Sequence, residues 1–292
     1  MAGNSREMSG DLIRHHVTNA PISEDSIFYP IADFFNSISI PFNKHVLMLW
    51  IAATITLIIS LWATRRYRKN KTAQPKGISH IYEMLLQFIK EDIILPNIGE
   101  KDAKRWTPLV ASFFIFILMC NFIGLIPFFE KVGGGGGATA TGNFGVTLAL
   151  ATITFFAIII AGTLKHGFIG HWKNMIPHGV PGPVLIILIP IEIIGMFVKP
   201  FALIMRLGAN MTAGHIGMVA IFALPIILGN GVNVYLGVAD SLSYTIGFFA
   251  GFIAVLLNVG IYGLELIVSL VQAYVFTLLS CVFIGMAIHA DH

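Results

Sequence analysis

Apolar residues form long runs along this chain, and short polar stretches separate the runs. About 20 apolar residues of α-helix cross a hydrocarbon core about 30 Å thick, and every one of the long runs reaches that length. The predicted crossings are residues 45–64, 107–129, 144–164, 184–228 and 242–288. The pattern therefore predicts an all-α, polytopic membrane protein with about five transmembrane helices.

The last two runs each exceed 40 residues, which is about 60 Å of helix and about twice what a perpendicular crossing requires. Each either breaks into two spans or lies strongly tilted in the membrane. Pro190, Pro200 and Pro225 permit breaks or kinks in the first of them. Neither run has a polar turn near its midpoint, so we expect two long, tilted or bent helices that form a C-terminal hairpin.

Charge placement predicts the orientation of the chain. A cluster of Lys and Arg follows the first run between residues 65 and 76, and by the positive-inside rule it is cytoplasmic. We therefore expect an external N-terminus, a cytoplasmic C-terminus and a location in the cell inner (plasma) membrane. Residues 78–95 mix apolar and charged side chains and are predicted to form an interfacial amphipathic helix. An external segment, 1–44, would precede a single membrane domain, 45–292.

Composition excludes several classes of protein. The chain is 56% hydrophobic and 11% charged, with a mean hydropathy of +0.81, which is too apolar for a soluble domain of 292 residues. Its two cysteines, Cys120 and Cys281, indicate neither a disulfide framework nor a metal cluster. No nucleotide loop or activated nucleophile is present in the sequence. We expect no cofactor, no metal and no nucleic-acid partner, although the histidines at 166, 171 and 178 leave a weak metal alternative.

A polar stripe runs through the fourth apolar run. Glu192, Lys199 and Arg206 are spaced seven apart, which keeps them within about 40° on one helix face, and Asn210 follows one turn later. Arg206 is the last Lys or Arg of the chain. A guanidinium cannot lose its proton, and burying it in lipid costs about 2.5–3.5 kcal/mol at a helix centre. Such a residue indicates a functional site.

The fifth run carries Glu265 and Gln272, again seven apart. In an antiparallel hairpin with Gln272 level with Arg206, Glu265 and His215 lie about 10 Å and about 13 Å toward the external side. The two would form a depth-matched pair that can pass a proton. His215 is about 180° around its helix from Arg206, so the pair and the arginine face different directions.

Each of these residues also has a structural interpretation. Lys199 could extend its ammonium to the inner interface, and Glu192 could neutralise it. His215 could be a hydrogen-bonded core residue, while Gln272 and Asn210 could join helices through hydrogen bonds.

The stretch Lys199-Pro-Phe-Ala-Leu-Ile-Met-Arg206-Leu-Gly-Ala-Asn210-Met-Thr-Ala-Gly-His215 resembles the signature of subunit a of the F-type rotary ATP synthase. The resemblance extends to Leu264-Glu265, to Gln272-Ala-Tyr-Val-Phe and to Asn121-Phe-Ile-Gly-Leu-Ile-Pro127. It covers most of the chain from about His45. The motif reads Leu-Gly-Ala-Asn where many members have Leu-Phe-Gly-Asn, which should alter packing more than chemistry.

The resemblance implies a proton-conducting stator subunit that is not itself a catalyst. Arg206 would face the carboxylates of a rotating membrane ring, promote their deprotonation and block leakage between two offset half-channels, with Asn210 as its companion. Gln272 would lie at the ring-facing end of the last helix. The outer half-channel pair falls on His215 and Glu265, with acid and histidine exchanged relative to some members.

Glu192 and Lys199 match positions near the inner half-channel. The partners implied are a ring of small two-helix subunits that bear carboxylates, membrane subunits of the peripheral stalk, and the lipid bilayer. A proton-coupled secondary transporter is the alternative, but the sequence shows no internal repeat of the kind such folds use. A purely structural membrane anchor would leave the polar stripe unexplained.

Overall fold

The computed structural model describes residues 22, 26, 28–37, 43–69, 77–126, 139–170, 182–236 and 240–289. Every element in these ranges is a helix, which confirms the all-α prediction. Five described helices are long and apolar enough to cross a membrane, as predicted. Their candidate spans are Lys44–Arg65, Glu100–Leu125, Phe144–His166, Ile194–Pro225 and Gly247–Ile288. The chain is a multi-pass membrane protein.

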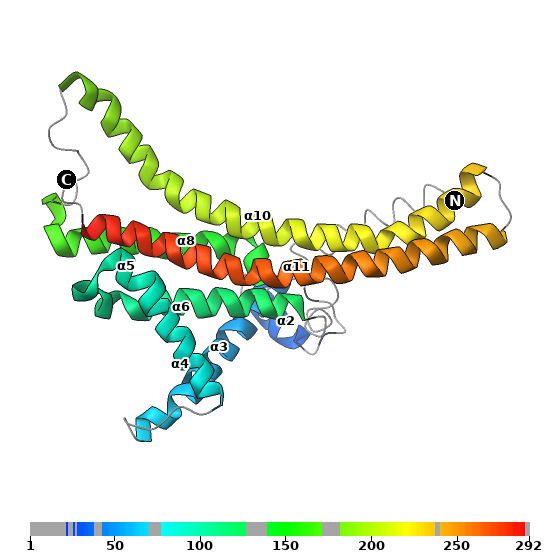
Figure 1. Cartoon of the computed structure of the whole chain (residues 1–292), viewed down its shortest axis with the longest axis horizontal. Coiled ribbons are helices and arrows are strands. Elements are labelled where there is room, and N and C mark those ends of the chain that lie inside the picture. Colours follow the sequence, from blue (N-terminus) through cyan, green and yellow to red (C-terminus); the bar gives the residue numbers. More distant parts are fainter. Residues whose placement is uncertain are drawn as a thin grey trace. The chain divides into compact units, whose positions relative to one another are not determined.

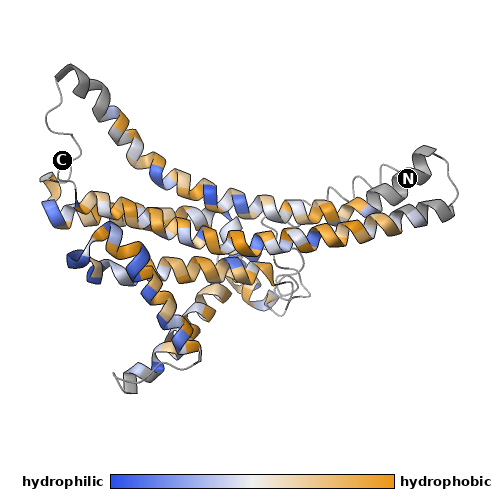
Figure 2. Ribbon diagram, in the orientation of Figure 1, coloured by the Kyte–Doolittle hydropathy of each residue, from blue (hydrophilic) through white to orange (hydrophobic). Residues whose placement is uncertain are grey.

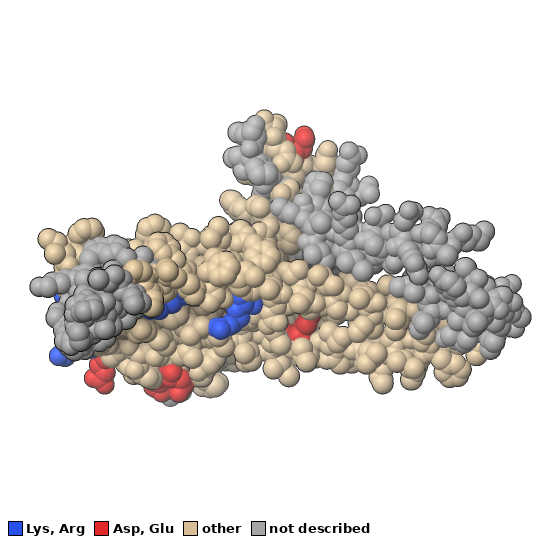
Figure 3. All heavy atoms as spheres, turned by 90° about the horizontal axis from the view of Figure 1, so that it is seen from above, with Lys and Arg blue, Asp and Glu red and all other residues tan. Residues whose placement is uncertain are grey.

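Figure 1 labels the helices in chain order. The elements are α2 (Tyr29–Ser37), α3 (Lys44–Lys69), α4 (Ile78–Phe88), the π-helix η1 (Ile89–Ile94), α5 (Leu95–Ile98), α6 (Glu100–Leu125), the 3₁₀ turn η2 (Ala140–Gly142), α8 (Phe144–His166), α10 (Gly182–Leu236) and α11 (Asp240–Ile288). In Figure 2, apolar residues run along most of α6, α8, α10 and α11. On the face drawn in Figure 3, the described residues are mostly uncharged, with a few Lys, Arg, Asp and Glu side chains among them.

Some helix bounds differ from those expected from the sequence. α6 begins at Glu100 rather than Thr107, because its first turns are polar and carry Glu100 and Asp102, which favour a helix N-terminus. Residues 127–129 of the predicted second span lie outside the described residues. α10 is one helical element of 55 residues that includes Pro190, Pro200 and Pro225, so no break divides it into two helices. The division into an external segment and a membrane domain stays a prediction.

The chain forms two compact units. The first comprises Met1–Ile51, Cys120–Asn143 and Ala209–Leu270, and the second comprises Ala52–Met119, Phe144–Gly208 and Val271–His292. In the first unit, α2 packs against the start of α3. Ile22, Ala32 and Leu47 are the buried residues of that contact.

Aromatic pairs connect the helices of the second unit. Phe88 of α4 contacts Phe114 of α6 and Tyr274 of α11, with ring centroids 6.3 and 6.1 Å apart. Phe155 of α8 stacks on Phe197 of α10 at 5.7 Å. Buried aliphatic residues of the same unit include Ile89 and Ile93 of η1 and Val110 and Ile117 of α6. The aromatic contacts therefore join α4 to α6 and α11, and α8 to α10.

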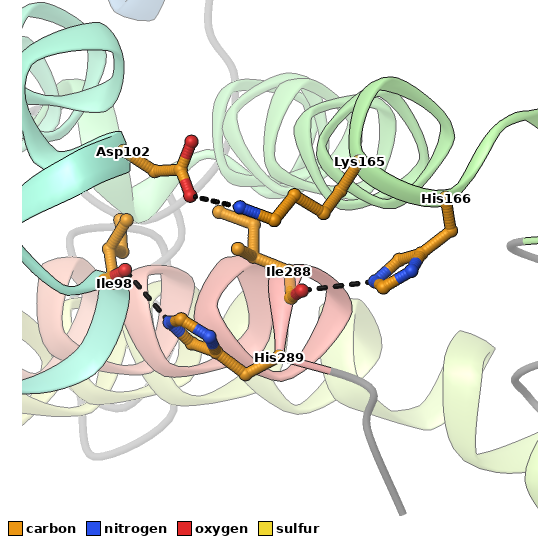
Figure 4. A network of polar contacts seen from close by, with 6 residues as sticks. All are labelled: Ile98, Asp102, Lys165, His166, Ile288 and His289. Atoms are coloured by element: carbon orange, nitrogen blue, oxygen red, sulfur yellow. Dashed lines mark hydrogen bonds and ion pairs between the residues drawn. The ribbon is translucent and has the colours of Figure 1, made fainter.

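Polar contacts join helix ends in the second unit (Figure 4). Lys165 of α8 forms an ion pair of 2.9 Å with Asp102 of α6. The His166 ring donates to the carbonyl oxygen of Ile288 at 3.0 Å, and the His289 ring donates to that of Ile98 at 2.9 Å. Ile98 and Ile288 end α5 and α11, and the last carbonyls of a helix lack partners within it. The two imidazoles supply those partners.

Candidate functional site

Arg206 lies on the exposed face of α10 in the second unit. Leu203 and Leu207 are each 1% exposed and pack inward, and a Cβ added at Gly208 would meet the Phe144 ring at 3.1 Å. This close packing of one face turns Arg206 outward. Among the described side chains, no carboxylate forms an ion pair with its guanidinium.

Gln272 of α11 contacts the same turn of α10. Its Nε2 donates to the backbone carbonyl oxygen of Arg206 at 2.7 Å, and its side chain is 4% exposed. This contact places Gln272 beside the Arg206 turn, which is the register assumed for the predicted hairpin. Because the amide binds the backbone, it positions the helix turn without neutralising the guanidinium.

Lys199, seven residues before Arg206, contacts an aromatic ring. Its Nζ lies 5.4 Å from the centroid of Phe283 on α11. Such a cation–π contact is worth about 0.5–2 kcal/mol. Glu192 lies on α10 as well, but its side chain is outside the described residues, so its pairing with Lys199 stays a prediction.

Glu265 is buried in the first unit, where it is 7% exposed. Its carboxylate lies against Gly214 of α10, at the spot that a Cβ of residue 214 would occupy. His215 is the next residue in α10, and its side chain is outside the described residues. The structure thus brings Glu265 to the turn that carries His215, while the pairing of the two side chains stays a prediction. Asn210 is exposed on the same helix.

A hydrogen-bonded network lies next to this carboxylate in sequence and in the same unit. Asn121 of α6 donates through Nδ2 to the carbonyl oxygen of Ser269 at 3.1 Å, and Thr141 of η2 donates to Asn121 Oδ1 at 2.6 Å. Tyr262 donates to the carbonyl oxygen of Leu125 at 3.1 Å. The sequence interpretation used Asn121 only as part of a motif. It missed the network, because its members are separated by up to 148 residues.

Two further polar residues of α11 were also missed. Asn258 and Ser269 are 6% and 0% exposed, and the Asn258 Nδ2 and Oδ1 and the Ser269 Oγ have no hydrogen-bond partner in the described part of the chain. One oxygen of Glu265, Oε2, shares this property. Each such atom costs about 1–3 kcal/mol if it is left dry. Spacing could have found Asn258, since 258, 265 and 272 are seven apart.

Across the described ranges, no group of three or more His, Cys, Asp or Glu is arranged to hold a metal ion. Among the described side chains of α10 and α11, Lys199, Arg206 and Glu265 are the charged residues of the polar positions discussed above.

Comparison with known proteins identifies the family. The family described as ATP synthase A chain matches residues 46–285. ATP synthase subunit a 2 of Chlorobium luteolum is 39% identical over 98% of this chain and 78% of that protein. ATP synthase subunit a 2 of Chlorobaculum tepidum is 38% identical over 99% of this chain and 76% of that protein, and subunit a of Chloroherpeton thalassium is 40% identical over 87% and 68%. The chain therefore belongs to the ATP synthase A chain family.

Proposed function

We propose that this chain is the stator subunit through which protons reach and leave the carboxylates of a rotating membrane ring. The observation that carries the proposal is Arg206, a cation exposed on a candidate membrane span and unpaired with any described carboxylate. A buried or lipid-facing charge needs a compensating partner. A carboxylate presented by a neighbouring subunit supplies one.

The choice of arginine has a physical reason. A carboxylate that crosses lipid must be neutral there, and a facing cation favours its ionised form. A lysine can lose its proton in an apolar site, whereas an arginine keeps its charge. A permanent positive charge at Arg206 therefore promotes deprotonation of the ring carboxylate and prevents protons from passing directly between two half-channels.

The outer half-channel would end at Glu265 and His215, and the inner one would begin near Glu192 and Lys199. Contact of Glu265 with Gly214, the neighbour of His215, supports the first assignment. A carboxylate and an imidazole within reach of each other can exchange a proton near neutral pH. Asn210, exposed one turn after Arg206, would face the ring with it.

Exposed apolar residues indicate what else surrounds the chain. Phe197 and Phe201 of α10 and Phe252 of α11 are 61%, 59% and 65% exposed. Such surfaces require lipid or a subunit partner. We assign them to the bilayer, to a ring of small two-helix subunits and to membrane subunits of a peripheral stalk. The N-terminus would be external and the C-terminus cytoplasmic, in the plasma membrane.

The experiment uses the complete ATP synthase in membrane vesicles and measures ATP-driven proton uptake with a pH-sensitive dye. Arg206→Ala should reduce uptake to background, and Arg206→Lys should also impair it. Arg105→Ala, which removes an exposed cation near the start of α6, should leave uptake unchanged. ATP hydrolysis by the same vesicles reports assembly. Full uptake by assembled Arg206→Ala complexes would overturn the proposal.

A further inference from the structure

A short turn of the first unit is buried although it only connects two helices. The η2 segment, residues 139–142, lies between α6 and α8 in the sequence. Its residues Thr139, Ala140 and Thr141 are 2%, 1% and 0% exposed. Connecting segments ordinarily run over the surface, because their backbone groups need hydrogen-bond partners. A buried turn must therefore find such partners within the protein.

Two helices hold the η2 segment from the N-terminal half of the chain. The His45 ring of α3 donates from Nδ1 to the carbonyl oxygen of Thr139 at 3.3 Å. Gly124 of α6 lies against the same residue, since a Cβ at position 124 would be 2.7 Å from Thr139 Cβ and 2.8 Å from its Cα. Thr141 Oγ1 donates to Oδ1 of Asn121, also on α6, at 2.6 Å. The segment is thus attached to α3 and α6.

The same segment is attached to the two long helices. Thr212 Oγ1 of α10 donates to the carbonyl oxygen of Gly142 at 3.3 Å. Asn121 uses the other end of its amide on α11, where Nδ2 donates to the carbonyl oxygen of Ser269 at 3.1 Å. All these residues belong to the first unit. The η2 segment therefore holds α10 directly and α11 through Asn121.

These attachments flank the place where α10 and α11 meet at Glu265. Thr212 is two residues before Gly214, and Ser269 is four residues after Glu265, so each attachment is within about one helical turn of the contact. The Glu265 carboxylate occupies the spot that a Cβ of residue 214 would fill. Gly214 has no side chain that could act as a spacer there.

We propose that the η2 segment is a positioning clamp that sets the separation of α10 and α11 at the Glu265 carboxylate. Hydrogen bonds are short and directional, so this clamp permits only a narrow range of separations. A carboxylate and a base exchange a proton only within hydrogen-bond reach of each other. Thr141 and Asn121 are therefore positioning residues for Glu265. The expected effect on proton uptake rests on the proposed function, whereas the helix separation does not.

The first test measures helix separation without relying on proton transport. Gly214→Cys and Glu265→Cys are combined in the complete ATP synthase, with Cys120→Ala and Cys281→Ala to remove the buried free cysteines. Glu265 Cγ lies 3.3 Å from the Cβ position of residue 214, so the two introduced sulfurs can meet. A mild oxidant should then form a disulfide in this parent protein. No disulfide in the parent would overturn the clamp, because the contact that it sets would be absent.

Variants of the clamp are then added to the parent. Thr141→Val removes the hydroxyl at nearly constant volume and should lower the disulfide yield several-fold. Thr141→Ser keeps the hydroxyl and should restore the yield. Thr277→Val is the matched control, because Thr277 is also 0% exposed and its hydroxyl binds the Ala273 carbonyl oxygen of its own helix. It should leave the yield unchanged. An unchanged yield with Thr141→Val would overturn the clamp.

The second test measures ATP-driven proton uptake in vesicles, normalised to the amount of this chain in the complex. Thr141→Val and Asn121→Leu should each lower uptake by about threefold or more, as expected for the loss of one buried hydrogen bond. Thr141→Ser should retain uptake. In a Gly214→Ala background, where the carboxylate is already displaced, Thr141→Val should cause no further loss. Effects of residues that act through one contact are not additive.

The two proposals fail separately. If Arg206→Ala pumps fully, the stator function is wrong, while a lower disulfide yield with Thr141→Val still supports the clamp. If Arg206→Ala abolishes uptake and Thr141→Val changes neither the disulfide yield nor uptake, the clamp is wrong and the stator function stands. If the losses from Thr141→Val and Gly214→Ala multiply, the η2 segment does not act through Glu265, and the clamp is wrong.

Discussion

The Gln272 side chain donates its hydrogen bond to the backbone carbonyl of Arg206, at 2.7 Å, and not to the guanidinium. This hydrogen bond therefore fixes the position of the Arg206 turn of α10 along the axis of α11 within the second unit. The same contact leaves the arginine charge uncommitted. The backbone oxygen of Arg206 thus makes the contact that positions the turn, while its guanidinium carries the charge.

Replacing Gln272 should separate these roles. Gln272→Met keeps the length of the side chain and removes the donor, so we expect a loss of about 1 kcal/mol in stability and a several-fold drop in proton uptake. Gln87→Met removes an exposed amide that binds Glu91 at 3.0 Å and is the control. Melting temperature of the detergent-purified complex and dye-based uptake in vesicles provide the readouts. Unchanged values for Gln272→Met would show that the hydrogen bond positions nothing.

Gly214 leaves no room for a larger residue beside Glu265. A Cβ at this position would overlap the carboxylate, whereas one at Gly217 would meet nothing within 4 Å. Under the proposed function, we expect Gly214→Ala to displace the Glu265 carboxylate, which is the flexible end of that side chain, and to reduce proton uptake several-fold. Gly217→Ala, in the same helix, should pump normally. Equal uptake by the two variants contradicts the contact.

Gly285 allows α11 to approach the backbone of α5 closely. A Cβ at Gly285 would overlap the carbonyl oxygen of Asn97, which cannot rotate away as a side chain can. Gly285→Ala should therefore destabilise the chain by about 1–3 kcal/mol. Gly263→Ala, also on α11, would meet nothing within 4 Å and should not destabilise it. Thermal unfolding in detergent distinguishes the two, and a stable Gly285→Ala protein would refute the close approach.

The ion pair between Lys165 and Asp102 should contribute little. Its side chains are 42% and 28% exposed, and exposed pairs are worth about 0–1 kcal/mol. Asp102→Asn should lower the melting temperature only slightly, and the difference should shrink at high salt. The double exchange Asp102→Lys with Lys165→Asp should restore the wild-type value. A loss above about 2 kcal/mol for the single variant would contradict this estimate.

Hydropathy was sufficient to predict the crossings, because lipid accepts only helices or closed barrels with apolar surfaces. Hydropathy placed the start of the second crossing at Thr107, because the turns from Glu100 onward are too polar to indicate a membrane-spanning segment. The π-helix η1 (Ile89–Ile94) was not predicted either, because its residues carry the same amphipathic pattern as the α-helix before it. The polarity pattern of this segment indicates a helix, but it does not distinguish the hydrogen bonding of a π-helix from that of an α-helix.

The candidate site was predictable where spacing along two helices was informative. The level placement of Gln272 with Arg206 was an assumption of the predicted hairpin, and the hydrogen bond between the two residues agrees with that assumption. Spacing could not show that Gly214 contacts Glu265 or that Asn121 contacts Ser269. Periodicity indicates the side of a helix on which a residue lies, but it does not indicate which distant segment packs there. The roles of the site residues in proton transfer stay predictions.

Lys199 and Arg206 differ in how far their charges are already engaged within the chain. Its ammonium lies 5.4 Å from the Phe283 ring, within its own chain, while Arg206 has no such attachment among the described residues. Under the proposed function, a negative group that passes along α10 would then meet one deep attractive position and one that is already partly satisfied. Two equally attractive cations would allow the negative group to pause beside either of them. Because Arg206 attracts it more strongly than Lys199 does, each step ends at the same residue.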